Sequence, residues 1–133
     1  MIYEGTNPIP NILVIDDDEI MQNVIEKVLL REGYNVEVAK NGKEGLSKLE
    51  LKRYNLVITD IMMPYANGFE IVSKLKQHPN TKDASVVVIS TIINESSVLD
   101  SYKMGVDEYI KKPIMVSEFI LRIKKLLGKQ ATA

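Results

Sequence analysis

The chain has 133 residues, which fits one domain and leaves little room for a second. It is 45% hydrophobic and 26% charged with a net charge of −1, so no strong overall field favours direct binding of nucleic acid or of an anionic membrane. It contains no cysteine, which excludes disulfides and thiolate metal sites. Its apolar runs are too short to cross a membrane and it shows no signal peptide, so we expect a cytoplasmic protein.

The first part of the chain predicts a lead-in, a strand and a helix. Residues 1–10, with two prolines, are predicted as an irregular lead-in. Ile12–Ile15 is short, apolar and rich in β-branched residues, as in a strand buried on both faces. An apolar stripe of helical period follows and ends before Gly33, and its members are Ile20, Met21, Val24, Ile25, Val28 and Leu29.

The same alternation of strand and helix continues to the end of the chain. Further strands are predicted at Val36–Val38, Leu56–Thr59, Val86–Ile89 and, more weakly, Tyr109–Ile110. Each is followed by a helical pattern, marked in turn by Leu46 and Leu49; by Phe69, Val72 and Leu75; by Val98 and Leu99; and by Phe119, Ile120, Ile123, Leu126 and Leu127. We expect one domain over residues 11–128 and a tail over 129–133.

Five strand–helix pairs in sequence favour an α/β fold, a doubly wound parallel sheet of five strands with helices on both faces. In such sheets, ligands bind outside the carboxyl ends of the strands. The residues that follow the predicted strands are therefore the candidates for a functional site, and they are Asp16, Asp17, Asp18 and Glu19 after the first strand, Asp60 after the third, Ser90 and Thr91 after the fourth, and Lys112 and Pro113 after the fifth.

These residue types suit a cation and an anion bound side by side. Clustered carboxylates repel one another, so some must be protonated or share a cation. Oxygen ligands without His or Cys favour a hard ion, and Mg²⁺ fits best because it accepts a few carboxylates together with water and a phosphate oxygen. Lys112 offers a positive charge to an anion, and the Ser90 hydroxyl can donate to the same anion. We expect Asp18 only to cap a helix.

Four segments together resemble the receiver domains of response regulators in two-component signalling, of the chemotaxis-regulator-like type. The segments are ILVIDDDE (Ile12–Glu19), NLVITDIMMPYANGFE (Asn55–Glu70), VVVIST (Val86–Thr91) and DEYIKKPI (Asp107–Ile114). The resemblance runs from Asn11 to Leu127 and implies a flavodoxin-like (βα)5 fold. It also implies a Mg²⁺-dependent transfer of a phosphoryl group from a phosphohistidine donor to Asp60, which becomes an aspartyl phosphate.

The resemblance assigns roles to single positions. It implies that Asp60 is both phosphoacceptor and metal ligand, that Asp17 binds the metal directly and that Asp16 supports it. The backbone carbonyl of Met62 would complete this Mg²⁺ site, which Mn²⁺ would also fill. Ser90 and Lys112 would contact the phosphoryl group, Ser90 and Tyr109 would act as the switch, and Pro113 would follow a cis peptide bond.

The resemblance also implies partners and an output. The donor would be a sensor histidine kinase or a histidine phosphotransfer protein, and phosphorylation would change the face formed by the fourth helix, fifth strand and fifth helix. That face would act on an effector protein or a missing output domain, or form a phosphorylation-dependent homodimer. Transfer would be self-catalysed, as in a signalling phosphoacceptor rather than a turnover enzyme. Thr91, Met62 and Ile92 predict slow autodephosphorylation, because their side chains limit the access of water.

Two other functions stay open at this point. The first is a phosphatase of the haloacid-dehalogenase-like type, because Asp16 and Asp18 have the spacing of its D-x-D pair. Against it, Gly-Thr does not follow the pair and the chain is short for that fold. The second alternative is a pseudo-receiver, a binding module that is never phosphorylated. His78, the single histidine, is expected to be exposed and to take no part in phosphoryl transfer.

Overall fold

A computed structural model of the chain describes residues 8–61, 68–91 and 94–132. Its centre is one parallel sheet whose strands lie in the order β2-β1-β3-β4-β5. The strands are β1 (Asn11–Ile15), β2 (Asn35–Ala39), β3 (Leu56–Asp60), β4 (Ser85–Ser90) and β5 (Glu108–Lys111). The chain reverses its direction of winding after β2, because β3 pairs with the other side of β1. The predicted five-stranded, doubly wound fold is confirmed.

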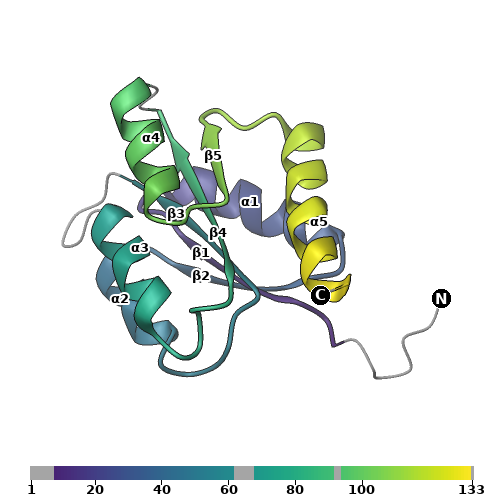
Figure 1. The fold of residues 1–133 in the computed structure, drawn as a ribbon. Helices are drawn as coiled ribbons and strands as arrows, with labels where there is room; N and C mark the ends of the chain where they lie inside the picture. The colour runs from purple at the N-terminus through teal and green to yellow at the C-terminus, as the bar shows by residue number, and fades with distance from the viewer. Residues whose placement is uncertain (1–7, 62–67, 92–93, 133) are drawn as a thin grey trace.

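Helices cover both faces of this sheet (Figure 1). They are α1 (Glu19–Arg31), α2 (Gly42–Lys48), α3 (Gly68–Gln77), α4 (Glu95–Lys103) and α5 (Val116–Thr132). The helices α1 and α5 bury one face of the sheet, and α2, α3 and α4 bury the other. Successive residues of a central strand therefore both enter a core, as Val57 and Ile58 do on opposite faces. Burial on both faces explains why these strands are continuous apolar runs in the sequence.

Polar side chains define where three of the helices begin. Asp18, Asn41 and Asn94 are the N-caps of α1, α2 and α4, and each accepts hydrogen bonds from backbone N–H groups of the first turn. The end of α1 is followed by Gly33, whose φ of +93° lies in the left-handed region that glycine adopts without steric cost. The predicted capping role of Asp18 is confirmed.

Two details differ from the sequence-based expectation. Ile20 and Val24 do not face the core, because the buried side of α1 is formed by Gln22, Ile25, Val28 and Leu29, and the side chain of Ile20 is 77% exposed. The backbone of α5 is helical to Thr132, through most of the segment expected to form a tail. Lys, Gln and Ala in that segment are good helix formers, so nothing local ends the helix there.

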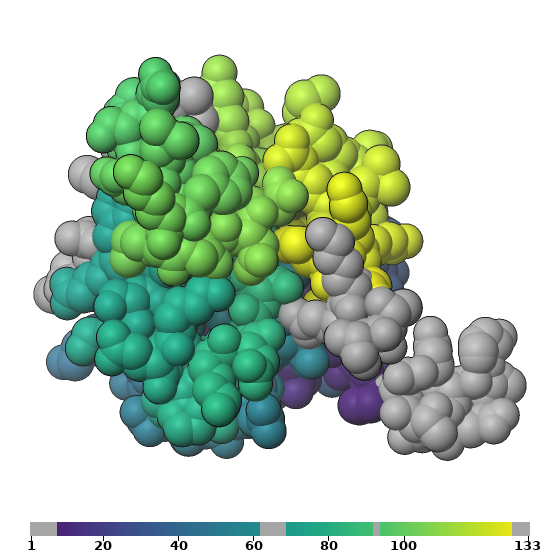
Figure 2. Space-filling view, viewed as in Figure 1, coloured from purple at the N-terminus to yellow at the C-terminus, as the bar shows by residue number. Residues whose placement is uncertain are grey.

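Both α4, in green, and α5, in yellow, are exposed on the surface shown in Figure 2. The edge strand β5 lies between them in the fold (Figure 1). Among the helices of the described residues, none combines the length and apolar character that crossing a membrane requires.

Candidate functional site

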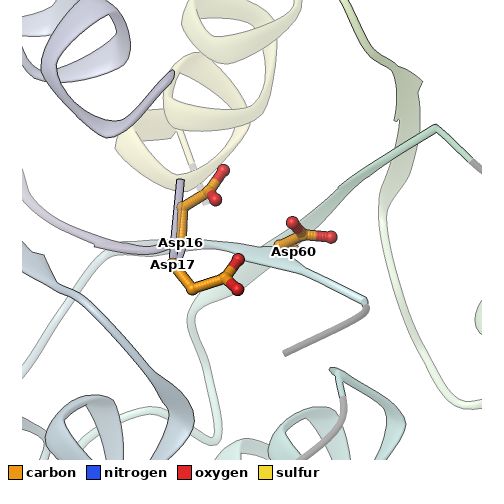
Figure 3. Close-up of side chains that lie close together, drawn as sticks. All are labelled: Asp16, Asp17 and Asp60. Carbon is orange, nitrogen blue, oxygen red and sulfur yellow. The ribbon is translucent and has the colours of Figure 1, made fainter. Parts of the chain in front are cut away.

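The carboxyl ends of β1 and β3 bring three aspartates together. Asp16 and Asp17 directly follow β1, and Asp60 is the last residue of β3. Each of them offers a carboxylate oxygen, and these oxygens lie within 4.8 Å of one another (Figure 3). Asp16 and Asp60 are buried, whereas Asp17 is exposed. The cluster is therefore a concentration of negative charge that reaches solvent at Asp17.

Lys112, which follows β5, connects two of these acids. Its Nζ donates a hydrogen bond to Oδ2 of Asp60 at 2.8 Å and lies 3.0 Å from Oδ2 of Asp16. Burial acts to lower the pKa of Lys112, but the hydrogen bond to Asp60 and the negative charges of both aspartates raise it above its usual value. Lys112 is thus a firmly protonated cation between two carboxylates.

Asp16 carries a buried oxygen with incomplete bonding. Its Oδ1 accepts a hydrogen bond from the backbone N–H of Asp18 at 2.8 Å. Its Oδ2 receives no well-directed hydrogen bond from any described residue, and its contact is the ion pair with Nζ of Lys112 at 3.0 Å. Burial raises the pKa of Asp16, although the Asp18 N–H and the Lys112 ammonium act to lower it. A further cation would compensate this buried charge.

The residues present fit a hard divalent ion. The donors are carboxylate oxygens, and nitrogen or sulfur ligands are absent from the described cluster. Asp16, Asp17 and Asp60 are the residues that would hold Mg²⁺, and the under-compensated Oδ2 of Asp16 gives such an ion a physical reason to bind. Met62, the fourth predicted ligand, lies outside the described residues.

The predicted hydroxyl lies on the strand next to Asp60. In the pairing of β3 with β4, Asp60 is opposite Ile89, so Ser90 is one residue further toward the carboxyl end. Ser90 is 1% exposed, and its backbone carbonyl accepts a hydrogen bond from the N–H of Lys112 at 2.9 Å. Thr91 is exposed at the same edge, and Ile92 lies outside the described residues. The strand ends thus bring Ser90 to the same edge of the sheet as Asp60 and Lys112.

The predicted switch residue Tyr109 is buried in the core on the face of the sheet that α2, α3 and α4 cover. It belongs to the edge strand β5, and its backbone N–H donates to the hydroxyl of Tyr102 on α4 at 3.3 Å. The peptide bond between Lys112 and Pro113 is cis, as the resemblance implied. Tyr109 therefore lies where β5 and α4 are joined.

His78 differs from the expectation of an exposed side chain. Its side chain is only 21% exposed, and its Nε2 lies 3.3 Å from a carboxylate oxygen of Glu50. Its Nδ1 accepts a hydrogen bond from the backbone N–H of Asn80. The turn after α3 lies against the end of α2, where Nδ2 of Asn80 donates to the backbone carbonyl of Leu49 at 2.8 Å, a contact that a sequence pattern does not show. These partners lie at the opposite end of the sheet from Asp60.

The sequence analysis missed one polar residue of this region. Gln22 on α1 is buried, and its Nε2 donates to the backbone carbonyls of Asp16 at 3.2 Å and Ala39 at 3.0 Å. A signal was available, because Gln22 is three residues before Ile25 and seven before Leu29 and so shares their buried face.

Comparisons with known proteins agree on one family. The model of the response regulator receiver domain matches residues 12–124. Response regulator ArlR of Staphylococcus epidermidis is 35% identical over 120 residues, which is 90% of this chain and 53% of that protein. ArlR of Staphylococcus aureus is 34% identical over 119 residues, with the same coverage. The chain therefore spans about half the length of the curated relatives it matches.

Solved structures show the same likeness. A CheY-like receiver domain protein from Methanospirillum hungatei has a TM-score of 0.88 at 29% identity, covering 94% of this chain and 98% of that one. The receiver domain of the Francisella response regulator 1452 has a TM-score of 0.82 at 31% identity, covering 91% and 98%.

Proposed function

The chain belongs to the response regulator family of receiver domains, which act in two-component signalling, and on this basis we propose that Asp60 is its phosphoacceptor. The donor would be a phosphohistidine on a sensor histidine kinase or a histidine phosphotransfer protein. The observation that carries the proposal is the bridge made by Lys112, whose Nζ lies 2.8 Å from Asp60 and 3.0 Å from Asp16. The bridge places a cation at the carboxylate that would attack and leaves Asp17 open to solvent beside it.

The proposed chemistry needs little from the protein beyond position and charge. An oxygen of the Asp60 carboxylate forms a bond to phosphorus while the bond from phosphorus to the histidine nitrogen breaks, and the imidazole leaves. The ionised carboxylate needs no general base. Lys112 would face the charge that the transferring phosphoryl group spreads over its oxygens, and the Ser90 hydroxyl would donate to one of them. When bound, Mg²⁺ or Mn²⁺ neutralises part of that charge.

We place the output on the face formed by α4, β5 and α5. Ser90 and Tyr109 would carry the change there, since Tyr109 is bonded through its N–H to Tyr102 of α4. The helices α4 and α5 and the residue before α5 expose large apolar side chains, which favours binding of another protein surface, and they are Leu99, Tyr102, Met115 and Leu121. An effector protein, an output domain or a second copy of the chain would bind this face after phosphorylation. Residues 11–128 as the receiver domain and a cytoplasmic location belong to the same proposal, supported by the family.

The test is phosphorylation by a small donor. The protein is incubated with acetyl phosphate and Mg²⁺, and intact mass measures the gain of one phosphoryl group. We expect wild type and Asp83→Asn to be labelled, since Asp83 is exposed at the amino end of β4, and Asp60→Asn to stay unlabelled.

Other outcomes would favour the alternatives. Labelling that survives in Asp60→Asn but is lost in Asp16→Asn would support a phosphatase nucleophile at Asp16, against the proposal. A wild-type protein that never gains mass would support the pseudo-receiver. Asp18 already serves as the cap of α1, which weighs against the D-x-D reading of the acidic pair.

A further inference from the structure

Gln22 is a buried polar side chain whose bonds end at the acidic site. Both hydrogens of its Nε2 are used, one toward the carbonyl oxygen of Asp16 at 3.2 Å and one toward that of Ala39 at 3.0 Å. These carbonyls lie at the carboxyl ends of β1 and β2, where the strands separate. A buried carbonyl without a donor is costly, so this amide has a physical reason to stay in place.

The carbonyl of Asp16 belongs to the peptide group that joins Asp16 to Asp17. Its orientation sets the directions in which both side chains leave the backbone, because a peptide group is planar and rigid. In the preceding peptide group, which joins Ile15 to Asp16, the N–H of Asp16 donates to the same carbonyl of Ala39 at 3.0 Å. The backbone at Asp16 is therefore held from two sides, by β2 and by the Gln22 amide.

We propose that Gln22 is a positioning residue for the cation site, which holds the Asp16–Asp17 peptide so that both carboxylates face Asp60. The inference rests on the proposed function, since it concerns the Mg²⁺ site that phosphoryl transfer would use. Groups that orient metal ligands commonly change metal affinity by about 10- to 100-fold when they are removed. Gln22 contacts neither the ion nor the phosphoryl group in this proposal and acts through the backbone.

A purely structural role predicts something different. Thr81 offers a matched control, because it is 1% exposed and its hydroxyl donates to the backbone carbonyl of Leu75 at 2.7 Å. Thr81 lies before β4, at the opposite end of the sheet from Asp16. Removing either donor leaves a buried carbonyl unsatisfied, so both substitutions should lower the midpoint of unfolding in urea. Only a positioning residue should also change Mg²⁺ binding.

The experiment compares Gln22→Met with Thr81→Val. Gln22→Met keeps a similar side-chain volume and removes the donor. The Mg²⁺ dissociation constant is measured by NMR titration with magnesium chloride, and unfolding in urea reports stability. We expect Gln22→Met to raise the dissociation constant about 10-fold or more and Thr81→Val to leave it within about twofold.

A folded Gln22→Met protein that binds Mg²⁺ as tightly as wild type would overturn the inference and leave the proposed function intact. A wild-type protein that binds no Mg²⁺ would instead overturn the proposed function itself. If Gln22→Met does not fold, the wild type still decides: the side-chain amide signals of Gln22 should shift with Mg²⁺ along with the backbone amide of Asp17, and unmoved Gln22 signals at saturation would contradict the proposal.

Discussion

Lys112 and Asp16 are in contact although their strands are not neighbours: Nζ of Lys112, which follows the edge strand β5, lies 3.0 Å from Oδ2 of Asp16, which follows β1, and β3 and β4 lie between these two strands in the sheet. The same ammonium donates to Asp60 at 2.8 Å. One largely buried cation therefore serves two buried carboxylates, and the cluster of three aspartates keeps an excess of negative charge. Buried charges that are incompletely paired cost stability, so the arrangement is one that a fold tolerates for function rather than for strength.

The first prediction concerns Asp16→Asn in the absence of divalent ions. Because the pKa of Asp16 is raised by burial, the folded state holds the proton more tightly than the unfolded state. This contribution to stability is complete below the ordinary value of 3.8 and is lost as the pH rises through the raised pKa. At pH 7 the ionised side chain lowers stability, so we expect Asp16→Asn to unfold at higher urea than wild type in EDTA, while Lys112 keeps Asp60 as its partner.

The advantage of Asp16→Asn should shrink when urea unfolding is repeated near pH 4, where wild-type Asp16 gains its proton. An Asn variant that is less stable than wild type at pH 7 would show that the ion pair with Lys112 outweighs the cost of burying the carboxylate.

The second prediction concerns the hydroxyl of Tyr102. It accepts a hydrogen bond from the N–H of Tyr109 on the edge strand β5, and Tyr102→Phe removes only that acceptor. We expect a loss of about 1 kcal/mol in the free energy of unfolding, the usual net value of one hydrogen bond. The amide proton of Tyr109 should also exchange faster with solvent. Unchanged exchange at this amide would show that the bond does not hold β5 against α4.

The third prediction compares two helical glycines. A Cβ at Gly45 of α2 would lie 2.6 Å from Cδ1 of the fully buried Ile15, whereas a Cβ at Gly128 of α5 meets nothing within 4 Å. Alanine gains up to about 1 kcal/mol over glycine in a helix, and overpacking a core costs about 1–3 kcal/mol. We therefore expect Gly45→Ala to lower the melting temperature and Gly128→Ala to raise it. Equal effects of the two substitutions would show that Ile15 moves freely.

The fourth prediction concerns the lifetime of the phosphorylated protein. Thr91 is exposed beside the site, and its β-branched side chain is expected to limit the approach of water to the phosphoryl group. After loading with acetyl phosphate and removal of the donor, intact mass should show a slow loss of the phosphoryl group. Thr91→Gly should shorten the lifetime of the phosphorylated protein. Loss from the wild type within seconds would contradict the expectation.

The amino-acid sequence was enough to predict the succession of strands and helices along the chain and the place of the main site residues. Asp17, Asp60 and Lys112 were found because parallel strands end at one edge of the sheet, so that a residue directly after a strand has a known position. The N-cap at Asp18 was equally accessible, since capping depends on neighbours within one turn.

The tertiary structure alone decided which of these groups is buried and which group bonds to which. Ile20 looks like a core residue by periodicity but is exposed, and His78 lies partly buried against Glu50. The donation by Gln22 to Asp16 and Ala39 joins a helix to two strand ends. Periodicity records only the local geometry of one helix or strand, whereas burial and hydrogen-bond partners depend on elements that are distant in the chain and meet only when it folds.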